Sequence, residues 1–307
     1  HRKGTQRDPT PGTGRDRGMI HVVGHTATDH IFKVPHLPGK NTSTQILDHQ
    51  IFFGGGAANI AVGIATLGGE SILVSAVGGD FTGSDYDTWL DKHRVGRFFY
   101  IEEDAHTALA CMFTDENEDQ ITFFEWGASE AFTKADPPAF DFVHMATADP
   151  SYNVKVAERA RFSSFDPGQD IHKYTAEQFE QLLDTIDLLF ANRFEAEIMG
   201  DVLNLTEEEL AARVPVAIFT RGGEGSRLYE DTSLTAIPSV PVTLIDPTGA
   251  GDAYRAGFLT AYQKEMSLAD CCRIGTVCSS FVIEKVGCQT NLPDWEQVQE
   301  RYQRYFG

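Results

Sequence analysis

The sequence predicts an α/β fold with a mainly parallel sheet and helices on both of its faces. Short apolar runs typical of buried strands alternate with amphipathic helical stretches along most of the chain. The length of 307 residues is enough to bury one large core and a small accessory piece. Two segments break the alternation with extended patterns, which predicts a second, smaller antiparallel sheet beside the main one.

The elements follow one another in a regular order. Residues 1–18 are rich in Arg, Gly, Pro and Thr, and we interpret them as a disordered leader or a remnant of the expression vector. The folded domain is expected over 19–307. Strand-like apolar runs lie at 19–24, 71–77, 142–146, 163–166, 188–191 and 216–220. Helical stretches lie at 57–67, 84–94, 251–264, 267–284 and 293–305.

The two extended segments span about 31–53 and 97–127. The second holds two alternating strands joined at 115–119, a polar stretch typical of a hairpin tip. A small sheet of this kind needs its apolar face covered by substrate or by a partner subunit. We therefore expect a homodimer in which two such sheets pack against each other.

Composition narrows the class of protein. The formal net charge is −20, from 45 acidic and 25 basic residues, which repels nucleic-acid backbones and disfavours nucleic-acid binding. No apolar run approaches the roughly 18 residues of a membrane helix, so no membrane association is expected. The five cysteines are odd in number and form no CxxC pair, which favours reduced thiols and a cytoplasmic location.

The most informative segment is 246–252, which reads Asp-Pro-Thr-Gly-Ala-Gly-Asp between a strand expected to end near Ile245 and a helix. Backbone N–H groups at a helix start are unpaired and form an anion site suited to phosphate. A carboxylate there repels phosphate, so Asp252 makes sense as a base that accepts the proton of an attacking hydroxyl. The alternative is that Asp252 only stabilises the helix through its dipole.

Three further segments are typical of ligand-binding loops. Segment 53–59 carries consecutive glycines, which let backbone approach a ligand, and then Asn59. Segment 192–195 places Asn192 and Glu195 after a strand, in the spacing of a helix capping box. Segment 220–225 is a glycine-rich turn at a strand end. Taken singly, each segment is also explained by ordinary loop structure.

Other motifs are missing from the sequence. It holds no GxxxxGK[ST] segment, so a P-loop nucleotidase is not indicated. No GxGxxG follows the first strand, where Gly24 precedes His25, so a Rossmann oxidoreductase is poorly supported. His25, His30 and His144 have no usual metal-ligand spacing and are expected to be core or surface residues.

In their order and spacing over 19–307, the four glycine- and Asn-containing segments resemble the ribokinase-like (PfkB) family of carbohydrate and nucleoside kinases. The resemblance implies a three-layer α/β/α sandwich with a mainly parallel central sheet and a small β-sheet lid. It also implies ATP as phosphate donor, Mg²⁺ as cofactor and, in many members, a monovalent cation near Asp246 and Thr248.

The resemblance also implies residue roles. Asp252 is the catalytic base, and the N–H groups of Gly249, Ala250 and Gly251 form the anion hole. The sugar is held by Asp29, Gly54, Gly55 and Asn59. ATP lies against Asn192, Thr220, Arg221, Gly222, Gly225 and Thr248. Glu195, with Asn192, positions Mg²⁺ through water, and one carboxylate is adequate because this ion often keeps its waters.

Segments 23–26, 41–43, 120–124, 164–170 and 287–293 are further similar to the nucleoside kinases of methanogenic archaea. This implies transfer of the ATP γ-phosphoryl group to the ribose 5′-hydroxyl of several nucleosides, such as inosine, guanosine and cytidine. It places Asp166 and Gln169 on the nucleoside side of the cleft. Two alternatives stay open: a sugar or sugar-phosphate kinase of the same family, and a non-catalytic nucleoside-binding regulatory protein. An intact Asp252 argues against the second, because binding alone needs no base.

Overall fold

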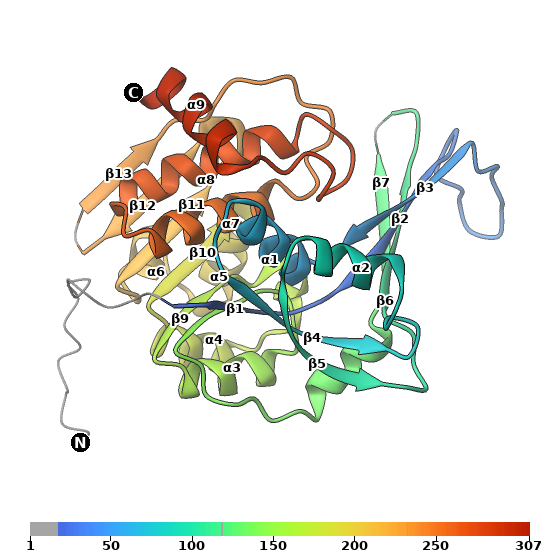
Figure 1. Cartoon of the computed structure of the whole chain (residues 1–307), viewed down its shortest axis with the longest axis horizontal. Coiled ribbons are helices and arrows are strands. Elements are labelled where there is room, and N and C mark those ends of the chain that lie inside the picture. The colour runs from blue at the N-terminus through green and yellow to red at the C-terminus, as the bar shows by residue number, and fades with distance from the viewer. Residues whose placement is uncertain (1–17, 118, 232) are drawn as a thin grey trace.

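In the computed structural model, which describes residues 18–117, 119–231 and 233–307, the chain forms two sheets of unequal size (Figure 1). The leader expected at 1–18 lies outside the described residues except for Gly18. Among the described helices, none is long and apolar enough to cross a bilayer.

The larger sheet has the strand order β13-β12-β11-β10-β9-β8-β1-β4-β5. Its bounds are β1 Ile20–Val23, β4 Ser71–Gly78, β5 Gly96–Glu102, β8 Phe142–Met145, β9 Phe162–Phe165, β10 Leu188–Asn192, β11 Val216–Thr220, β12 Ser226–Glu230 and β13 Ser233–Ile237. All pairs from β5 to β11 are parallel, and only β12 and β13 are antiparallel. The predicted mainly parallel sheet is confirmed, with an edge hairpin that the sequence pattern did not reveal.

Helices cover both faces of the larger sheet. One face carries α1 Gly56–Thr66, α2 Asp85–Lys92, α7 Ala250–Gln263, α8 Leu268–Val282 and α9 Trp295–Phe306. The other carries α3 Pro150–Arg159, α4 Ala176–Leu183, α5 Arg193–Leu203 and α6 Glu207–Ala211. Short 3₁₀ helices lie at Gly127–Thr133, Gly168–Lys173 and Gly222–Glu224. Neighbouring strand residues alternate between the two cores, as Val22 and Val23 do. The predicted three-layer sandwich is confirmed.

The smaller sheet, which we call the lid sheet, has the order β3-β2-β6-β7 and stands to one side of the larger sheet (Figure 1). Its bounds are β2 Ala27–Lys33, β3 Asp48–Gly54, β6 Ala108–Thr114 and β7 Gln120–Glu125. The expectation of a purely antiparallel sheet is wrong, because the central pair β2–β6 is parallel. These two strands come from distant segments, so no hairpin turn sets their direction.

The expected lid segments, about 31–53 and 97–127, also need correction. β2 already begins at Ala27, and β5 belongs to the larger sheet, where it pairs with β4. A half-exposed edge strand has the same period-2 pattern in either sheet, so periodicity did not distinguish them. Asp115 N donates to the Asp119 carbonyl at 3.0 Å, which closes the predicted hairpin tip, although Glu118 within it lies outside the described residues.

The strand expected to end near Ile245 is absent from the described fold, and 238–249 is an irregular connection. The N–H groups of Ile245 and Asp246 donate to the Ile283 carbonyl, at 2.8 and 3.2 Å, instead of to a strand. Ile245 is 58% exposed, so its apolar character does not mark a core position.

Candidate active site

The predicted site residues gather where the parallel strands of the larger sheet end. Asp166 follows β9, Asn192 ends β10, and Thr220 ends β11. Because β9, β10 and β11 are parallel, their carboxyl ends share one edge, which is where open α/β sheets bind ligands. The starts of α1 and α7 and the strand β2 meet at the same edge.

Asp252 lies in the first turn of α7, whose N-cap Gly249 has a left-handed φ of 81°. Its Oδ2 accepts a hydrogen bond from Asn59 Nδ2 at 2.8 Å. Its Oδ1 lies toward Gly56, where an added Cβ would be 3.7 Å away. Burial raises the pKa of Asp252, while Arg255 and the hydrogen bond from Asn59 oppose the rise. One oxygen is therefore held by the protein, and the other faces the glycine-lined start of α1.

The loop expected to form the anion hole leaves no room for a side chain at Gly249. A Cβ on Gly249 would be 2.9 Å from the Cys288 side chain. The Ala250 N–H donates to the Pro247 carbonyl at 3.2 Å, so it is partly committed to the loop itself. The N–H of Gly251 is in the first helical turn, where no acceptor exists within the helix. This group is available to an anion.

Asp246 fixes the loop before α7 through both of its carboxylate oxygens. Oδ1 accepts from Thr248 N at 2.9 Å, and Oδ2 accepts from Gly287 N at 3.2 Å. The loop is thereby tied to the segment that follows α8. Among the described residues, no group of three or more His, Cys, Asp and Glu side chains is arranged to hold a metal ion.

Asp29 lies on β2 with its carboxylate against the glycines that precede α1. An added Cβ on Gly54 would be 2.2 Å from Asp29 Oδ2, so only glycine fits there. Burial raises the pKa of Asp29 to about 7, and the carboxylates of Asp252 and Asp246 add to the rise. Carboxyl groups that raise the pKa of one another in this way are typical of functional sites.

The turn into α1 places the remaining predicted sugar contacts. Gly55 has a φ of 89°, and an added Cβ would be 2.5 Å from the His25 carbonyl oxygen. Asn59 is buried one turn into α1. Both polar atoms of its amide have a partner in the protein, since Nδ2 donates to Asp252 and Oδ1 accepts from Gln289 Nε2 at 2.8 Å. Asn59 therefore acts on Asp252 in this structure.

Asn192 and Glu195 form the predicted capping box at the start of α5. Glu195 N donates to Asn192 Oδ1 at 2.9 Å, and Asn192 N donates to Glu195 Oε2 at 2.7 Å. Glu195 Oε2 is also 3.8 Å from Arg255 Nη2. The second oxygen of this carboxylate remains for a hard cation, and a single carboxylate suits Mg²⁺ held through its own waters. The residues present therefore fit the expected ion.

Asp166 was expected on the nucleoside side of the cleft, and its two oxygens are both occupied by the protein. Oδ1 accepts from Gly168 N at 3.1 Å, and Oδ2 lies 2.5 Å from Arg255 Nε. Burial raises the pKa of Asp166, and the Arg255 guanidinium counteracts this rise. Gln169, at the start of the following 3₁₀ helix, is exposed. Asp166 thus anchors Arg255 beneath the start of α7.

The loop after β11 lies beside the start of α5. Gly225 has a φ of 91°, and an added Cβ would overlap the Ile237 carbonyl oxygen. Gly222 also has a left-handed φ, of 54°. The Arg221 guanidinium is held by Glu207 in an ion pair with both side chains mostly buried. The charge that the resemblance assigns to ATP is therefore already paired in this structure.

A family model described as pfkB family carbohydrate kinase matches residues 17–295. The chain belongs to this family. Kinases of the pfkB family are phosphotransferases that use an alcohol group as acceptor, so the predicted enzyme class is confirmed.

This pfkB-family chain is similar to two named nucleoside kinases. It is 44% identical over 294 residues to that of Methanocaldococcus jannaschii, covering 93% of the chain and 97% of the relative. It is 39% identical over 303 residues to that of Methanothermobacter thermautotrophicus, covering 95% and 97%. The predicted resemblance to methanogen nucleoside kinases is confirmed.

Solved structures agree with the fold. The crystal structure of the M. jannaschii nucleoside kinase matches with a TM-score of 0.91 at 42% identity, over 95% of this chain and 100% of that one. The Burkholderia thailandensis nucleoside kinase in complex with inosine matches with a TM-score of 0.85 at 25% identity, over 94% and 98%. The ribokinase-like fold is confirmed.

Sequence reasoning missed two buried polar residues of this pfkB-family site. Arg255 stands one helical turn after Asp252, a spacing that puts both on one face of α7 and could have marked it. Gln289 sits in a loop with no periodicity, and only its position within segment 287–293 singled it out. Its partners come from α1 and α2, far away in sequence.

Two of the histidines considered as metal ligands, His25 and His144, are buried packing residues. His25 is buried, with its ring centroid 5.0 Å from Phe124 and 4.9 Å from Trp126. His144 is buried with Nδ1 2.9 Å from Ser164 Oγ, and burial lowers its pKa to about 3. His25 therefore joins the end of β1 to the lid sheet.

Proposed function

We propose that the chain is an ATP-dependent nucleoside kinase that transfers the γ-phosphoryl group to the ribose 5′-hydroxyl. The observation that carries the proposal is the closeness of Asp252 and Asp29 across the glycines that precede α1. A base beside a carboxylate that can accept from two neighbouring hydroxyls suits a ribose-containing acceptor. Relatives named nucleoside kinase, one of them bound to inosine, support this class of acceptor.

Asp252 is the general base of the proposed reaction. Its Oδ1 accepts the proton as the 5′-oxygen forms a bond to the γ-phosphorus and the bond to the β-phosphate oxygen breaks. The N–H groups at 249–251 stabilise the charge on the transferring group. Asp29 and Gly54 hold the ribose, and Asn59 acts through Asp252. The proton ends on Asp252 and ADP leaves.

A relative in complex with ADP and inosine supports ATP as the donor. The phosphates of ATP are proposed to lie along Thr220, Gly222, Gly225 and Thr248, at the carboxyl end of β11 and the start of α7. Glu195 and Asn192 would hold Mg²⁺ through water, and the ion would neutralise charge on the phosphates. A monovalent cation is proposed near Asp246 and Thr248.

The lid sheet is proposed to cover the acceptor and exclude water, which limits wasteful hydrolysis of ATP. Broad specificity, including inosine, guanosine and cytidine, is part of the proposal. A cytoplasmic location fits the cysteines, which are odd in number and form no CxxC pair.

The lid sheet also supports the proposal of a homodimer. One face carries aromatic and aliphatic side chains in register across the strands, namely Ile51, His30, Cys111, Phe123, His49, Phe32, Phe113 and Ile121. Phe32 stacks on His49 at 4.2 Å and on Phe113 at 4.6 Å between ring centroids. Phe123 is 64% exposed, so this face is left for a partner.

The test is ADP release with Mg·ATP against inosine, guanosine, cytidine, adenosine, ribose and fructose 6-phosphate, for the wild type and Asp252→Asn. We expect nucleosides to give the highest kcat/KM, and the variant to lose at least about 10³-fold in kcat. Turnover of sugars alone would overturn the acceptor. Full activity of Asp252→Asn would overturn the base.

A further inference from the structure

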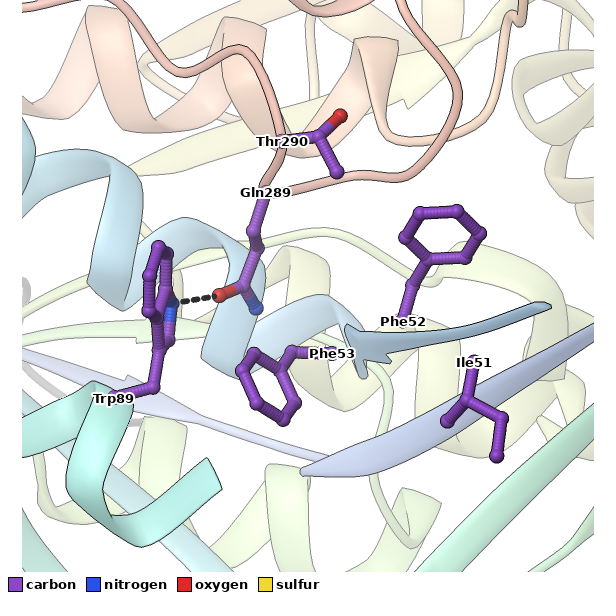
Figure 2. Close-up of a pocket in the computed structure, with 6 residues that line it drawn as sticks. All are labelled: Ile51, Phe52, Phe53, Trp89, Gln289 and Thr290. Carbon is purple, nitrogen blue, oxygen red and sulfur yellow. Dashed lines mark hydrogen bonds between the residues drawn. The ribbon is translucent and has the colours of Figure 1, made fainter. Parts of the chain in front are cut away.

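A buried amide connects the surface beside the lid sheet to Asp252. Gln289 lies in the loop between α8 and α9 and is 6% exposed. It lines a cavity of about 320 Å³ together with residues of β3 and α2, and Figure 2 shows its amide turned toward the Trp89 indole. The loop thereby reaches across two helices that are distant in sequence.

Every polar atom of the Gln289 side chain has a partner. Oε1 accepts from Trp89 Nε1 at 2.8 Å, as drawn in Figure 2. Nε2 donates to Asn59 Oδ1 at 2.8 Å and to the Tyr86 hydroxyl at 2.9 Å. Asn59 Nδ2 then donates to Asp252 Oδ2 at 2.8 Å. The four bonds form a continuous network that ends on the proposed base.

The direction of this network is fixed at its outer end. An indole N–H only donates, so the atom of Gln289 that faces Trp89 must be the carbonyl oxygen. The amide nitrogen of Gln289 must then face Asn59, whose Oδ1 accepts the hydrogen bond. The Asn59 nitrogen is left to face Asp252, where its N–H meets a carboxylate oxygen that accepts.

We propose that Gln289 is a positioning residue for phosphoryl transfer, which holds the Asn59 amide so that its N–H group faces Asp252. The proposal rests on Asp252 being the base. Asp252 Oδ2 is then occupied as an acceptor, and Oδ1 is left for the proton of the substrate hydroxyl. Without Gln289, the Asn59 amide can turn over and direct its oxygen at the carboxylate, which favours the protonated form of Asp252.

The hydrogen bond from Gln289 Nε2 to Tyr86 ties the same network to the glycines beside the acceptor site, which with the starts of α1 and α7 we call the floor. The Tyr86 hydroxyl, which accepts from Gln289, donates to the Gly54 carbonyl oxygen at 2.7 Å. The Tyr86 ring stacks on Phe53 with centroids 4.3 Å apart. A single amide therefore sets both the orientation of Asn59 and the position of the glycine turn against Asp29.

The charged groups around Asp252 come from several elements: Arg255 on α7, Glu195 on α5, Asp166 after β9 and Asp29 on β2. None of them touches Gln289 through a hydrogen bond, since its partners are Trp89, Tyr86 and Asn59. Replacing Gln289 therefore changes the environment of Asp252 through Asn59 and leaves these charges in place.

The experiment compares the pH dependence of kcat/KM for wild type and Gln289→Met, an unbranched side chain of similar length without donors. The best acceptor of the wild type is used, whichever nucleoside or sugar it is, so a wrong substrate class does not obscure the result. Because the base must be ionised, we expect the acid limb of the variant to move to higher pH by about one unit. The kcat/KM of the variant should be about tenfold below that of the wild type at low pH, and the difference should shrink as pH rises.

Two further variants separate positioning from general loosening of the loop. Thr290→Val removes hydrogen bonds to Val286 and Gly287 within the same loop and none to the network. It is expected to lower the melting temperature without moving the acid limb. In an Asn59→Ala background, Gln289→Met should add less than about twofold to the loss in kcat, because Gln289 acts through Asn59.

An unmoved acid limb, or a loss that adds in full to that of Asn59→Ala, overturns the proposal. If Gln289→Met does not fold, Trp89→Phe removes the donor that fixes the amide while keeping a ring against Phe53. It should move the acid limb in the same direction by a smaller amount. An unmoved limb in that folded variant overturns the proposal as well.

Discussion

The two regions that enclose the site are built in opposite ways. At the start of α1 and α7, the polar side chains are buried and tied to one another, as in the network from Gln289 through Asn59 to Asp252. In the lid sheet, β7 is exposed along its whole length, and Phe123 and Ile51 lie on the surface. The polar groups of the first region are satisfied within the chain, whereas the apolar side chains of the second are left uncovered.

The residues around Asp252 are held rigidly, whereas the lid sheet is free to adapt. A base must be held within a fraction of an ångström of its target, which buried hydrogen-bond networks achieve. A cover must open and close, and such elements come from regions with few buried contacts. Substitutions in the floor should therefore cost stability or chemistry, and substitutions on the lid face should cost neither.

The largest effect is expected from Arg255→Met, which tests whether the floor is held by charge. Arg255 is 8% exposed, 2.5 Å from Asp166 and 3.8 Å from Glu195. Its loss leaves two buried carboxylates without their cation, and we expect the free energy of unfolding to fall by about 3–5 kcal/mol. Urea denaturation of both proteins measures this change in the free energy of unfolding.

The double variant Asp166→Asn, Arg255→Met is the control for that interpretation. It removes one of the two carboxylates along with the cation, so it should be more stable than Arg255→Met alone. Equal stability of Arg255→Met and the wild type would show that the floor does not depend on this ion pair.

Asp29 should show a conflict between stability and binding. Its pKa of about 7 lies above its ordinary value of 3.8, so the folded state binds the proton more tightly than the unfolded state does. The stability of the wild type should therefore fall as pH rises from about 4 to 7, and stay level above. Asp29→Asn removes this loss, and we expect it to be more stable than the wild type at pH 8 by about 2–4 kcal/mol.

The affinity for the acceptor should move the other way. In the proposed complex the ionised carboxylate accepts from two ribose hydroxyls, so the Kd of the nucleoside should fall as pH rises through about 7 in the wild type. Calorimetric titrations at pH 6 and pH 8 measure this. A variant that is less stable than the wild type at pH 8, or a wild-type Kd independent of pH, would show that Asp29 is ionised without ligand.

A glycine pair tests whether the floor is limited by space or by backbone alone. Gly249 and Gly83 have nearly the same φ, 81° and 79°, but an added Cβ is 2.9 Å from Cys288 at the first and meets nothing within 4 Å at the second. Gly83→Ala should cost about 1 kcal/mol for the backbone. Gly249→Ala should cost about 2–3 kcal/mol and lower kcat at least tenfold. Equal losses in thermal unfolding and unchanged turnover would mean that the loop moves freely.

The parallel strands inside the larger sheet could be predicted from the sequence, because each is a short apolar run that neighbouring residues alone reveal. Segments such as 188–191 and 216–220 are apolar on both faces, as parallel strands must be. The motif 246–252 likewise carries its own local geometry, since a glycine turn and a helix start are properties of neighbouring residues.

What could not be predicted depends on contacts between distant segments. Segment 97–102 has a strand pattern that fits either sheet, and only its neighbour β4 decides. The partners of Asp166 and Arg221, namely Arg255 and Glu207, are likewise set by packing. The motif places Asn59 against the sugar, whereas in the structure its amide bonds to Asp252 and to Gln289, which is 230 positions away.

The smallest effect on stability is expected on the lid face, from Phe123→Gln. Phe123 is 64% exposed, and Phe194 on α5 is 63% exposed, which makes Phe194→Gln a matched control. Both should change the free energy of unfolding of the subunit by less than about 0.5 kcal/mol. Only Phe123→Gln should lower the mass seen by light scattering at micromolar concentration, because only the lid face is proposed to meet a second copy. A wild type that is already monomeric, or a Phe123→Gln variant that keeps the dimer mass, would leave the lid sheet as a cover for substrate alone. The lid sheet would then be covered on binding ligand and not by a second copy. In that case nucleoside, in place of a partner chain, should protect β7 from hydrogen exchange.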